Sequence, residues 1–321
     1  MARLFDQVVG HSKPIEQLIA AVESGRLSHT LLLVGPSGIG KALVARGLAQ
    51  ALVCETSHRA CGACPSCIRM GKGESEALLH VAPDGSQIKR EQAQEVLRFL
   101  NLQAWGKARV VIIEEAHLLN VQAANALLKS LEEPPEKTFF ILTAVNAYGV
   151  LPTIRSRSQV TRLAPLGREE VRGMGGVEDW MVESCMGRLD VLSQLREPEV
   201  MERRQEALRL WAGLGERRPM ELAKASIEQA GDKEGSMQLI QWWRQMLRDA
   251  RFCQDDLEPL IHSDFRQPIE RFSQLAPDVL HWLHQELMEL EAGMKGNWDR
   301  QLAFETFFLR ADELVRAQAN P

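Results

Sequence analysis

The sequence predicts an α/β domain built on a parallel sheet, followed by a part of the chain that is helical throughout. Up to Pro165, short apolar runs typical of buried strands alternate with helical patterns, and this order favours a parallel sheet covered by helices on both faces. Beyond Pro165, the apolar periodicity is almost entirely helical, and β-branched runs are nearly absent. The length of 321 residues is sufficient for two or three domains.

The first predicted elements flank a glycine-rich segment. We expect a helix from about Pro14 to Glu23, with Ser12 as its N-cap and Gly25 just after its end. Thr30–Val34 is an apolar run with the length of a buried strand, and a helix follows from Lys41 to about Leu52.

Two further strands and one helix complete the predicted sheet. Val110–Ile113 and Phe139–Val145 are apolar runs, and Val121–Glu133 between them has a helical pattern. Pro134 and Pro135 end that helix, because proline lacks the N–H group of the helical ladder and disfavours helix in the residue before it. We take Phe139–Val145 as the last strand.

The second half is predicted to be a helix bundle that begins after a break at Gly173–Gly176. Six of the seven tryptophans lie here, and we expect them in the bundle core. Cys185 and Cys253 lie in helical segments, where we expect buried, small apolar side chains. The predicted helices are Val177–Cys185, Pro198–Leu214, Met220–Gln229, Ser236–Cys253, Pro277–Gly293 and Asn297–Ala317.

The formal net charge of −5 conceals an asymmetry, since residues 1–166 carry +4 and residues 167–321 carry −9. Neither half is basic enough to indicate DNA binding by itself, so any action on DNA would pass through partners. No apolar run approaches the length that spans a bilayer, and the first residues lack the pattern of a secretory signal. We therefore expect a cytoplasmic protein.

The glycine-rich segment has the pattern of a P-loop, a loop that binds phosphate groups. It follows a buried strand and opens a helix, so its backbone N–H groups can surround phosphate oxygens while the lysine adds a full positive charge. The expected nucleotide-binding residues are Gly35, Pro36, Ser37, Gly38, Ile39, Gly40, Lys41 and Ala42.

The residues that would handle a metal ion depart from the usual P-loop pattern. A Ser or Thr hydroxyl normally follows the lysine and holds Mg²⁺, but here the residue is Ala42, which has no oxygen to offer. The second acidic motif ends a strand with Glu114 and Glu115. Glu114 is one methylene longer than the usual Asp, whereas Glu115 stands at the position of a residual water-orienting base. The sequence predicts nucleotide binding with impaired metal handling.

Four cysteines follow the P-loop helix in a loop with Gly and Pro, at about residues 53–73. Cys54, Cys61, Cys64 and Cys67 have the spacing of a tetrahedral Zn²⁺ site, in which each short C-x2-C turn places two sulfurs on one ion. A disulfide pair is the alternative, and a cytosolic location makes it improbable. We expect a structural zinc ion.

The segment TIRSRSQV, Thr153 to Val160, places Arg155 and Arg157 between serines after the predicted last strand. Exposed arginines usually face solvent. A guanidinium at such a loop could instead stabilise charge on a phosphate held by a neighbouring subunit. The spacing alone does not decide between these two interpretations.

Together these motifs resemble the clamp-loader branch of the AAA+ family. The segments that carry the resemblance cover about residues 3–166 and occur in this order: FDQVVGH, HTLLLVGPSGIGK, the four-cysteine insertion, RVVIIEEAHLL, AANALLKSLEEPP and IRSRS. The helical remainder matches only in length and character. The resemblance implies an AAA+ core at residues 1–166, a helical lid at 167–205 and a helical collar for oligomerisation at 206–321.

The resemblance also implies roles for individual residues. Arg157 matches the arginine finger that reaches the ATP of the adjacent subunit, and Thr143 falls at the sensor-1 position. Arg188 lies near the sensor-2 position of the lid, in a loose alignment, and Val8 and Val9 would flank the adenine.

Two kinds of subunit within the branch compete. Motor subunits (gamma/tau) also carry four cysteines, but they keep Ser or Thr after the P-loop lysine, have an N-terminal arm and are often longer. This sequence has Ala42, starts almost directly at Leu4 and Phe5, and has 321 residues, which favours a stator subunit with a degenerate nucleotide site. Such a subunit would join gamma/tau and delta subunits in a hetero-pentamer. It would reach the sliding clamp and primed DNA through that complex during replication by DNA polymerase III.

Two alternatives to a stator subunit belong to other functional classes, an ATPase and a nucleic-acid-binding protein. A self-sufficient AAA+ ATPase is indicated by Lys41 and Glu115, and the sequence leaves open whether the chain is itself an enzyme. A zinc-dependent nucleic-acid binder is weaker, because the cysteine loop has few aromatic residues and only Arg59, Arg69 and Lys72 nearby to contact phosphates. No paired-Asp site for two-metal nucleotidyl transfer is visible, so polymerase chemistry would belong to the assembly.

Overall fold

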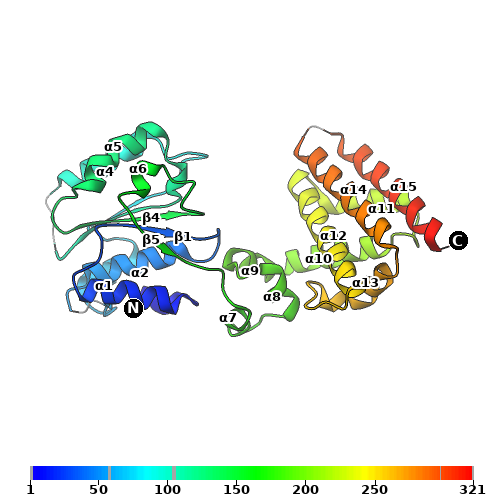
Figure 1. Ribbon diagram of the computed structural model, residues 1–321, viewed down its shortest axis with the longest axis horizontal. Coiled ribbons are helices and arrows are strands. Elements are labelled where there is room, and N and C mark those ends of the chain that lie inside the picture. Colours follow the sequence, from blue (N-terminus) through cyan, green and yellow to red (C-terminus); the bar gives the residue numbers. More distant parts are fainter. Residues whose placement is uncertain (1–2, 57–58, 103–105, 297, 320–321) are drawn as a thin grey trace. The chain divides into compact units, whose positions relative to one another are not determined.

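The computed structural model describes residues 3–56, 59–102, 106–296 and 298–319. The chain divides into two compact units (Figure 1). The first, which we call the core unit, is Met1–Val171 together with Gly187–Asp190, and the second, the helical unit, is Arg172–Met186 together with Val191–Pro321. Among the described residues, no helix is both long and apolar enough to cross a membrane.

The core unit is built on a parallel sheet whose strand order is β2-β3-β4-β1-β5. The order places the carboxyl ends of β3, β4 and β1 side by side, which is where α/β sheets bind ligands. The predicted α/β fold class is confirmed. The strands are β1 (Thr30–Val34), β2 (Leu78–Val81), β3 (Arg109–Ile113), β4 (Thr138–Ala144) and β5 (Gln159–Arg162).

Helices cover both faces of this sheet, with α1 and α2 on one face and α4, α5 and α6 on the other (Figure 1). Successive residues of β1 point to opposite faces of the sheet. Leu31 and Leu33 pack with α1 and α2, whereas Leu32 and Val34 pack with α4 and α5. The elements are η1 (Leu4–Gln7), α1 (Ser12–Glu23), α2 (Lys41–Val53), α3 (Pro65–Lys72), α4 (Arg90–Asn101), η2 (Ala116–Leu118), α5 (Val121–Glu132), α6 (Pro152–Arg155) and α7 (Arg168–Arg172).

Two expectations for the core unit were wrong. Ser12 is the first residue of α1 rather than its N-cap; the cap is His11, which has a left-handed backbone (φ 57°) and makes no capping bond with its side chain. The strand Phe139–Val145 is not the last, because Val160 lies in β5, a short strand paired in parallel with β1. β5 is only partly buried and polar at both ends, so apolar periodicity does not indicate it.

The helical unit confirms the expected bundle. Trp180, Trp211, Trp242 and Trp243 are buried, as expected, whereas Trp298 is 59% exposed. Cys185 is buried and Cys253 packs at the edge of the core. Asn297, the predicted start of the last helix, lies outside the described residues. The helices are α8 (Asp179–Cys185), α9 (Leu189–Leu195), α10 (Pro198–Ala212), α11 (Pro219–Ala230), α12 (Lys233–Gln254), η3 (Ser263–Phe265), α13 (Arg266–Ser273), α14 (Pro277–Lys295) and α15 (Arg300–Ala319).

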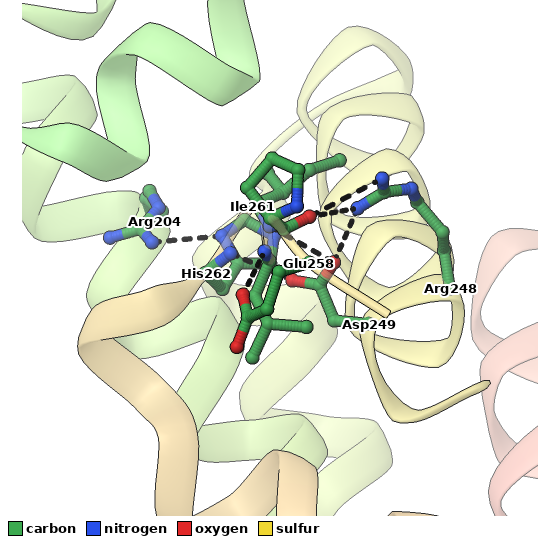
Figure 2. Close-up of polar contacts among 8 residues, drawn as sticks. Arg204, Arg248, Asp249, Glu258, Ile261 and His262 are labelled. Atoms are coloured by element: carbon green, nitrogen blue, oxygen red, sulfur yellow. Dashed lines mark hydrogen bonds and ion pairs between the residues drawn. The ribbon is translucent and has the colours of Figure 1, made fainter. Parts of the chain in front are cut away.

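A buried polar network joins three parts of the helical unit (Figure 2). Arg204 of α10 is 1% exposed, pairs with Asp264 at 2.6 Å and lies 3.7 Å from the centre of the Trp180 ring. The same guanidinium donates to Nδ1 of His262 at 2.8 Å, so that nitrogen accepts and His262 is held neutral. Burial, followed by the charge of Arg204, accordingly holds the pKa of His262 well below its ordinary value.

The buried carboxylate of Asp249 completes this network from α12. It accepts the backbone N–H groups of Ile261 at 3.0 Å and His262 at 2.7 Å, and it pairs with Arg248 at 2.7 Å (Figure 2). Burial nevertheless raises the pKa of Asp249. The network, together with the buried side chains of Leu260 and Ile261, fixes the irregular segment before η3 against α10 and α12.

Candidate functional site

The P-loop leaves β1 at the carboxyl edge of the sheet and ends at the first residue of α2. Gly35 donates its N–H to Ala144 of β4 at 3.1 Å, which ties the loop to the neighbouring strand. Gly38 and Gly40 have φ values of 75° and 93°, a conformation that favours glycine. Lys41 donates from Nζ to the carbonyl oxygen of Gly35 at 2.8 Å and to that of Pro36 at 2.6 Å. The loop therefore has the curled backbone that a phosphate site requires.

The two acids after β3 have different surroundings. Oε1 of Glu114 lies 2.8 Å from Nε2 of His80 on β2, and this hydrogen bond lowers the pKa of Glu114. Glu115 donates its backbone N–H to the hydroxyl of Thr143 on β4 at 3.1 Å. The contact joins the expected water-orienting position to the expected sensor-1 position across neighbouring strands.

Charge couples these acids to the P-loop. Burial lowers the pKa of Lys41, and the charges of Glu115, Asp190 and Glu114 act in the opposite direction, while Arg188 adds to the lowering. The charges of Glu114, Glu115 and Arg188 therefore all act on Lys41.

The donor set does not fit a magnesium–nucleotide complex. Ala42, at the second position of α2, offers only a methyl group where a metal ligand is needed. The Glu114 carboxylate is engaged by His80. The loop has the backbone curl of a phosphate site, but the side chains that would hold Mg²⁺ there are missing or already paired.

The residues before α1 also reach the P-loop. His11 is 8% exposed, and its Nε2 lies 2.8 Å from the carbonyl oxygen of Ile39. Val8 packs at the edge of the core beside α1 and α2, and Val9 is half-buried next to it. Sequence reasoning missed His11 as part of the loop environment, because its contact depends on the left-handed backbone turn that precedes α1.

Arg157 has partners outside the group around Lys41. It forms an ion pair with Glu132, the last residue of α5, at 2.9 Å, and donates to the carbonyl oxygen of Thr153 at 3.0 Å. Its side chain is 31% exposed. Arg155 instead lies 5.3 Å from the centre of the exposed Tyr148 ring. The two arginines of the TIRSRSQV segment are therefore in distinct settings.

The four cysteines converge after the end of α2. Their Sγ atoms all lie within 4.8 Å of one another, and the Cys54–Cys64 and Cys61–Cys67 pairs are 4.0 and 3.9 Å apart. Ligands at about 2.3 Å from a tetrahedral zinc ion would be about 3.8 Å apart, so the cluster could hold such an ion. No disulfide links any of the six cysteines, all of which are described.

Backbone amides prepare these sulfurs for negative charge. Cys61 donates its N–H to Sγ of Cys54 at 3.3 Å, Cys64 to Sγ of Cys61 at 3.2 Å and Cys67 to Sγ of Cys64 at 3.4 Å. Hydrogen bonds from Thr56 and Cys64 lower the pKa of Cys61 to about 5, whereas burial raises the pKa of Cys67. Amide donors around sulfur are a second coordination layer that favours thiolate ligands.

Comparison with known proteins agrees with the motifs of the core unit. Residues 10–167 match a family model described as DNA polymerase III, delta subunit. The match covers just under half of the chain and lies within the core unit. The chain is also similar to DNA polymerase III subunit delta' of Escherichia coli K12, with 37% identity over 155 residues, and to that of Pseudomonas aeruginosa, with 36% over 160.

The chain is also similar to other subunits of DNA polymerase III. DNA polymerase III subunit tau of E. coli K12 is 36% identical over 173 residues. The matches cover 47–52% of this chain, but only 26% of tau and 46–48% of the delta' proteins, so the chain spans from a quarter to about half of its relatives' lengths. A gamma subunit-related protein of DNA polymerase III from Thermotoga maritima shares the fold, with a TM-score of 0.51, 16% identity, and coverage of 94% of this chain and 100% of that one.

Proposed function

We propose that the chain is the delta-prime, or stator, subunit of a DNA polymerase III clamp loader, and that it assists the ATP-driven loading of the sliding clamp onto primed DNA. It supplies Arg157 to the ATP of an adjacent motor subunit and hydrolyses little or no ATP itself. The observation that carries the proposal is a contrast within one unit: Ala42 and the engaged Glu114 impair the P-loop, whereas Arg157 is intact and held ready.

The setting of Arg157 supports its role as an arginine finger. Glu132 and the carbonyl oxygen of Thr153 hold the guanidinium on one side, and almost a third of the side chain is exposed. A planar guanidinium can bind two phosphate oxygens at once, and in trans it stabilises the charge that develops during phosphoryl transfer. Exchange of Glu132 for a phosphate partner would require only local movement of an exposed side chain.

The remaining site residues keep lesser roles in this proposal. The P-loop Gly35–Ala42 gives residual phosphate affinity, with Val8 and Val9 beside the adenine. Glu115 is a vestigial water-orienting base next to Thr143 at the sensor-1 position. ATP and magnesium are not required for what the chain does in trans.

We assign the Cys54, Cys61, Cys64 and Cys67 cluster to a structural zinc ion. Four thiolates fill a tetrahedral shell and leave no position for a substrate, so the ion would fix the fold rather than act in chemistry. Cys54 is the C-cap of α2, the helix that starts at the P-loop lysine. The zinc module therefore anchors the far end of that helix.

The proposed assembly follows the predicted division of the chain. The AAA+ core at 1–166 carries the nucleotide loop and Arg157, the lid spans 167–205, and the helical collar at 206–321 packs with the collars of other subunits in a cytoplasmic hetero-pentamer. The partners are the gamma/tau and delta subunits, with the sliding clamp and primed DNA bound through the complex.

Reconstitution tests the arginine finger. The loader would be assembled with gamma/tau and delta subunits and either wild-type chain, Arg157→Ala or Arg155→Ala. DNA-stimulated ATP hydrolysis should fall at least about tenfold with Arg157→Ala, because arginine fingers contribute on the order of a thousandfold at the site they serve. Arg155→Ala, two residues away, should leave it unchanged. Equal turnover in all three loaders would contradict the proposal.

A motor-type ATPase is the second candidate, and one contact favours it. The bond between Glu115 and Thr143 joins two positions of an ATPase site, and the charge of Glu115 acts on Lys41. Steady-state hydrolysis by the purified chain, abolished by Lys41→Ala, would support this candidate over the stator.

A further inference from the structure

A short segment of the lid sequence belongs to the core unit. Gly187–Asp190 packs with the core, although the residues on both sides of it, Arg172–Met186 and those from Val191 onward, belong to the helical unit. Leu189 donates its N–H to the carbonyl oxygen of Gly38 in the P-loop at 2.7 Å, and Leu166 donates to Gly187 at 3.1 Å. A Cβ at Gly187 would lie 2.4 Å from the carbonyl oxygen of Leu166, so only glycine permits this approach. The segment is docked at both ends.

Docking places the carboxylate of Asp190 on the P-loop itself. A Cβ at Gly38 would lie 1.7 Å from Oδ1, 2.0 Å from Cγ and 2.4 Å from Oδ2 of Asp190, so the whole carboxylate packs against the α-carbon of Gly38. The charge of Asp190 also acts on Lys41. Gly38 thus provides the space for an acidic group between the loop and the docked segment.

Arg188 orients this carboxylate. Its Nε donates to Oδ1 at 3.2 Å and its Nη2 to Oδ2 at 2.7 Å, a two-point pairing that commits the guanidinium to Asp190. The two side chains are 38% and 42% exposed, and ion pairs as exposed as this contribute little to stability. The arrangement is therefore poorly explained by a need to hold the fold together.

The position of the Asp190 carboxylate should weaken phosphate binding at the loop. A P-loop attracts phosphate through its N–H groups and its lysine, and a carboxylate placed on the loop repels the same anion. The cation that would screen this repulsion, Mg²⁺, lacks its ligand at Ala42, and the only nearby guanidinium described for this segment, that of Arg188, is already paired.

We propose that Asp190 is a specificity-determining residue that weakens the binding of nucleoside di- and triphosphates at the P-loop of this chain. The proposal rests on the proposed function in that both treat this P-loop as a site without turnover. It adds a residue that acts against the nucleotide, beyond the loss of metal ligands.

Nucleotide titration of the purified full chain tests this role. The probe is a fluorescent ADP or ATP analogue, added at low salt with and without Mg²⁺, and the variants are Asp190→Asn and Asp190→Ala. Both should bind the probe at least about tenfold more tightly than the wild type, and the gain should shrink as added salt screens the charge. Asp84→Asn is the matched control, because Asp84 is an exposed acid of the core unit that pairs with Lys89. It should bind as the wild type does.

Two further variants test whether the gain in nucleotide affinity depends on the P-loop. Lys41→Ala in the Asp190→Asn background should abolish the gain, and Arg188→Ala alone should bind no better than the wild type, because it keeps the negative charge of Asp190 on the loop. Thermal unfolding would show that each variant is folded. Wild-type affinity equal to that of Asp190→Asn, or a gain that survives Lys41→Ala, would overturn the proposal. The loader's response to Arg157→Ala is measured separately, so either proposal can fail alone.

Discussion

The P-loop and the arginine element lie in the same unit of the chain, yet they differ in what remains of ATP chemistry. At the P-loop, Lys41 binds the loop's own carbonyl groups, Ala42 replaces a metal ligand, and Asp190 lies against the loop. At the arginine element, Arg157 is complete and is held by Glu132 of a neighbouring helix. Under the proposed function, Arg157 acts on a neighbour's nucleotide although the nucleotide site of its own unit is impaired.

Loss of the metal cluster should have the largest effect and should fall on the P-loop side. Cys67→Ser removes one of four thiolates from a buried position in α3, the helix that follows the P-loop helix α2. We expect loss of bound zinc and a decrease of about 3–5 kcal/mol in the free energy of unfolding of the core unit, since structural zinc binding is coupled to folding. Zinc analysis and calorimetry check this, with Cys253→Ser as control. Retained stability without zinc would mean that the cluster is not structural.

Acidification should lower the stability of the helical unit before it affects the P-loop or the arginine element. The folded protein holds His262 neutral, with a pKa below the ordinary 6.5, so the unfolded chain binds the extra proton as the pH falls below about 6.5. Stability is then lost with a slope of at most about 1.4 kcal/mol per pH unit. The raised pKa of Asp249 acts in the opposite direction, so the contribution of His262 is read from the comparison with His262→Gln. Parallel pH profiles for the two proteins would contradict the assignment.

Restoring the Mg²⁺ ligands should give the P-loop back part of its ATP chemistry and so make it more like the arginine element. In the Asp190→Asn background, Ala42→Thr with Glu114→Asp supplies a hydroxyl and a shorter carboxylate at the positions that bind Mg²⁺. Affinity for the fluorescent nucleotide should become dependent on Mg²⁺, by about tenfold, or 1.4 kcal/mol. If nucleotide affinity did not depend on Mg²⁺, residues 42 and 114 would not be the cause of the impaired metal binding.

Substitution of Glu132, which pairs with Arg157, should have a smaller effect on ATP turnover. Glu132→Gln keeps a hydrogen-bonding side chain but removes the ion pair with Arg157. In the reconstituted loader, maximal ATP turnover should fall by about threefold with little change in KM, since positioning acts on the chemical step. Glu133→Gln, at the next residue, is the control. A change in KM alone would indicate a general effect on assembly.

The sequence predicted the elements that carry strong periodicity and motif chemistry. β1, α2, β3 and α5 lie within a residue or two of their expected bounds, and the four cysteines converge as their spacing indicated. It missed β2 and β5, which are strands of four residues, and α4, whose pattern is more polar. Asp190 could not be placed on Gly38 from spacing, because the two are 152 positions apart in the sequence and the contact depends on the close approach that Gly187 allows.

The central claim is that this chain contributes Arg157 and not its own nucleotide site, and one paired measurement tests it most directly. Loaders reconstituted with Lys41→Ala or with Arg157→Ala in this chain would be compared for DNA-stimulated ATP hydrolysis. The account predicts that Lys41→Ala changes turnover by less than about twofold, whereas Arg157→Ala lowers it at least about tenfold. A loader that fails with Lys41→Ala and tolerates Arg157→Ala would contradict it.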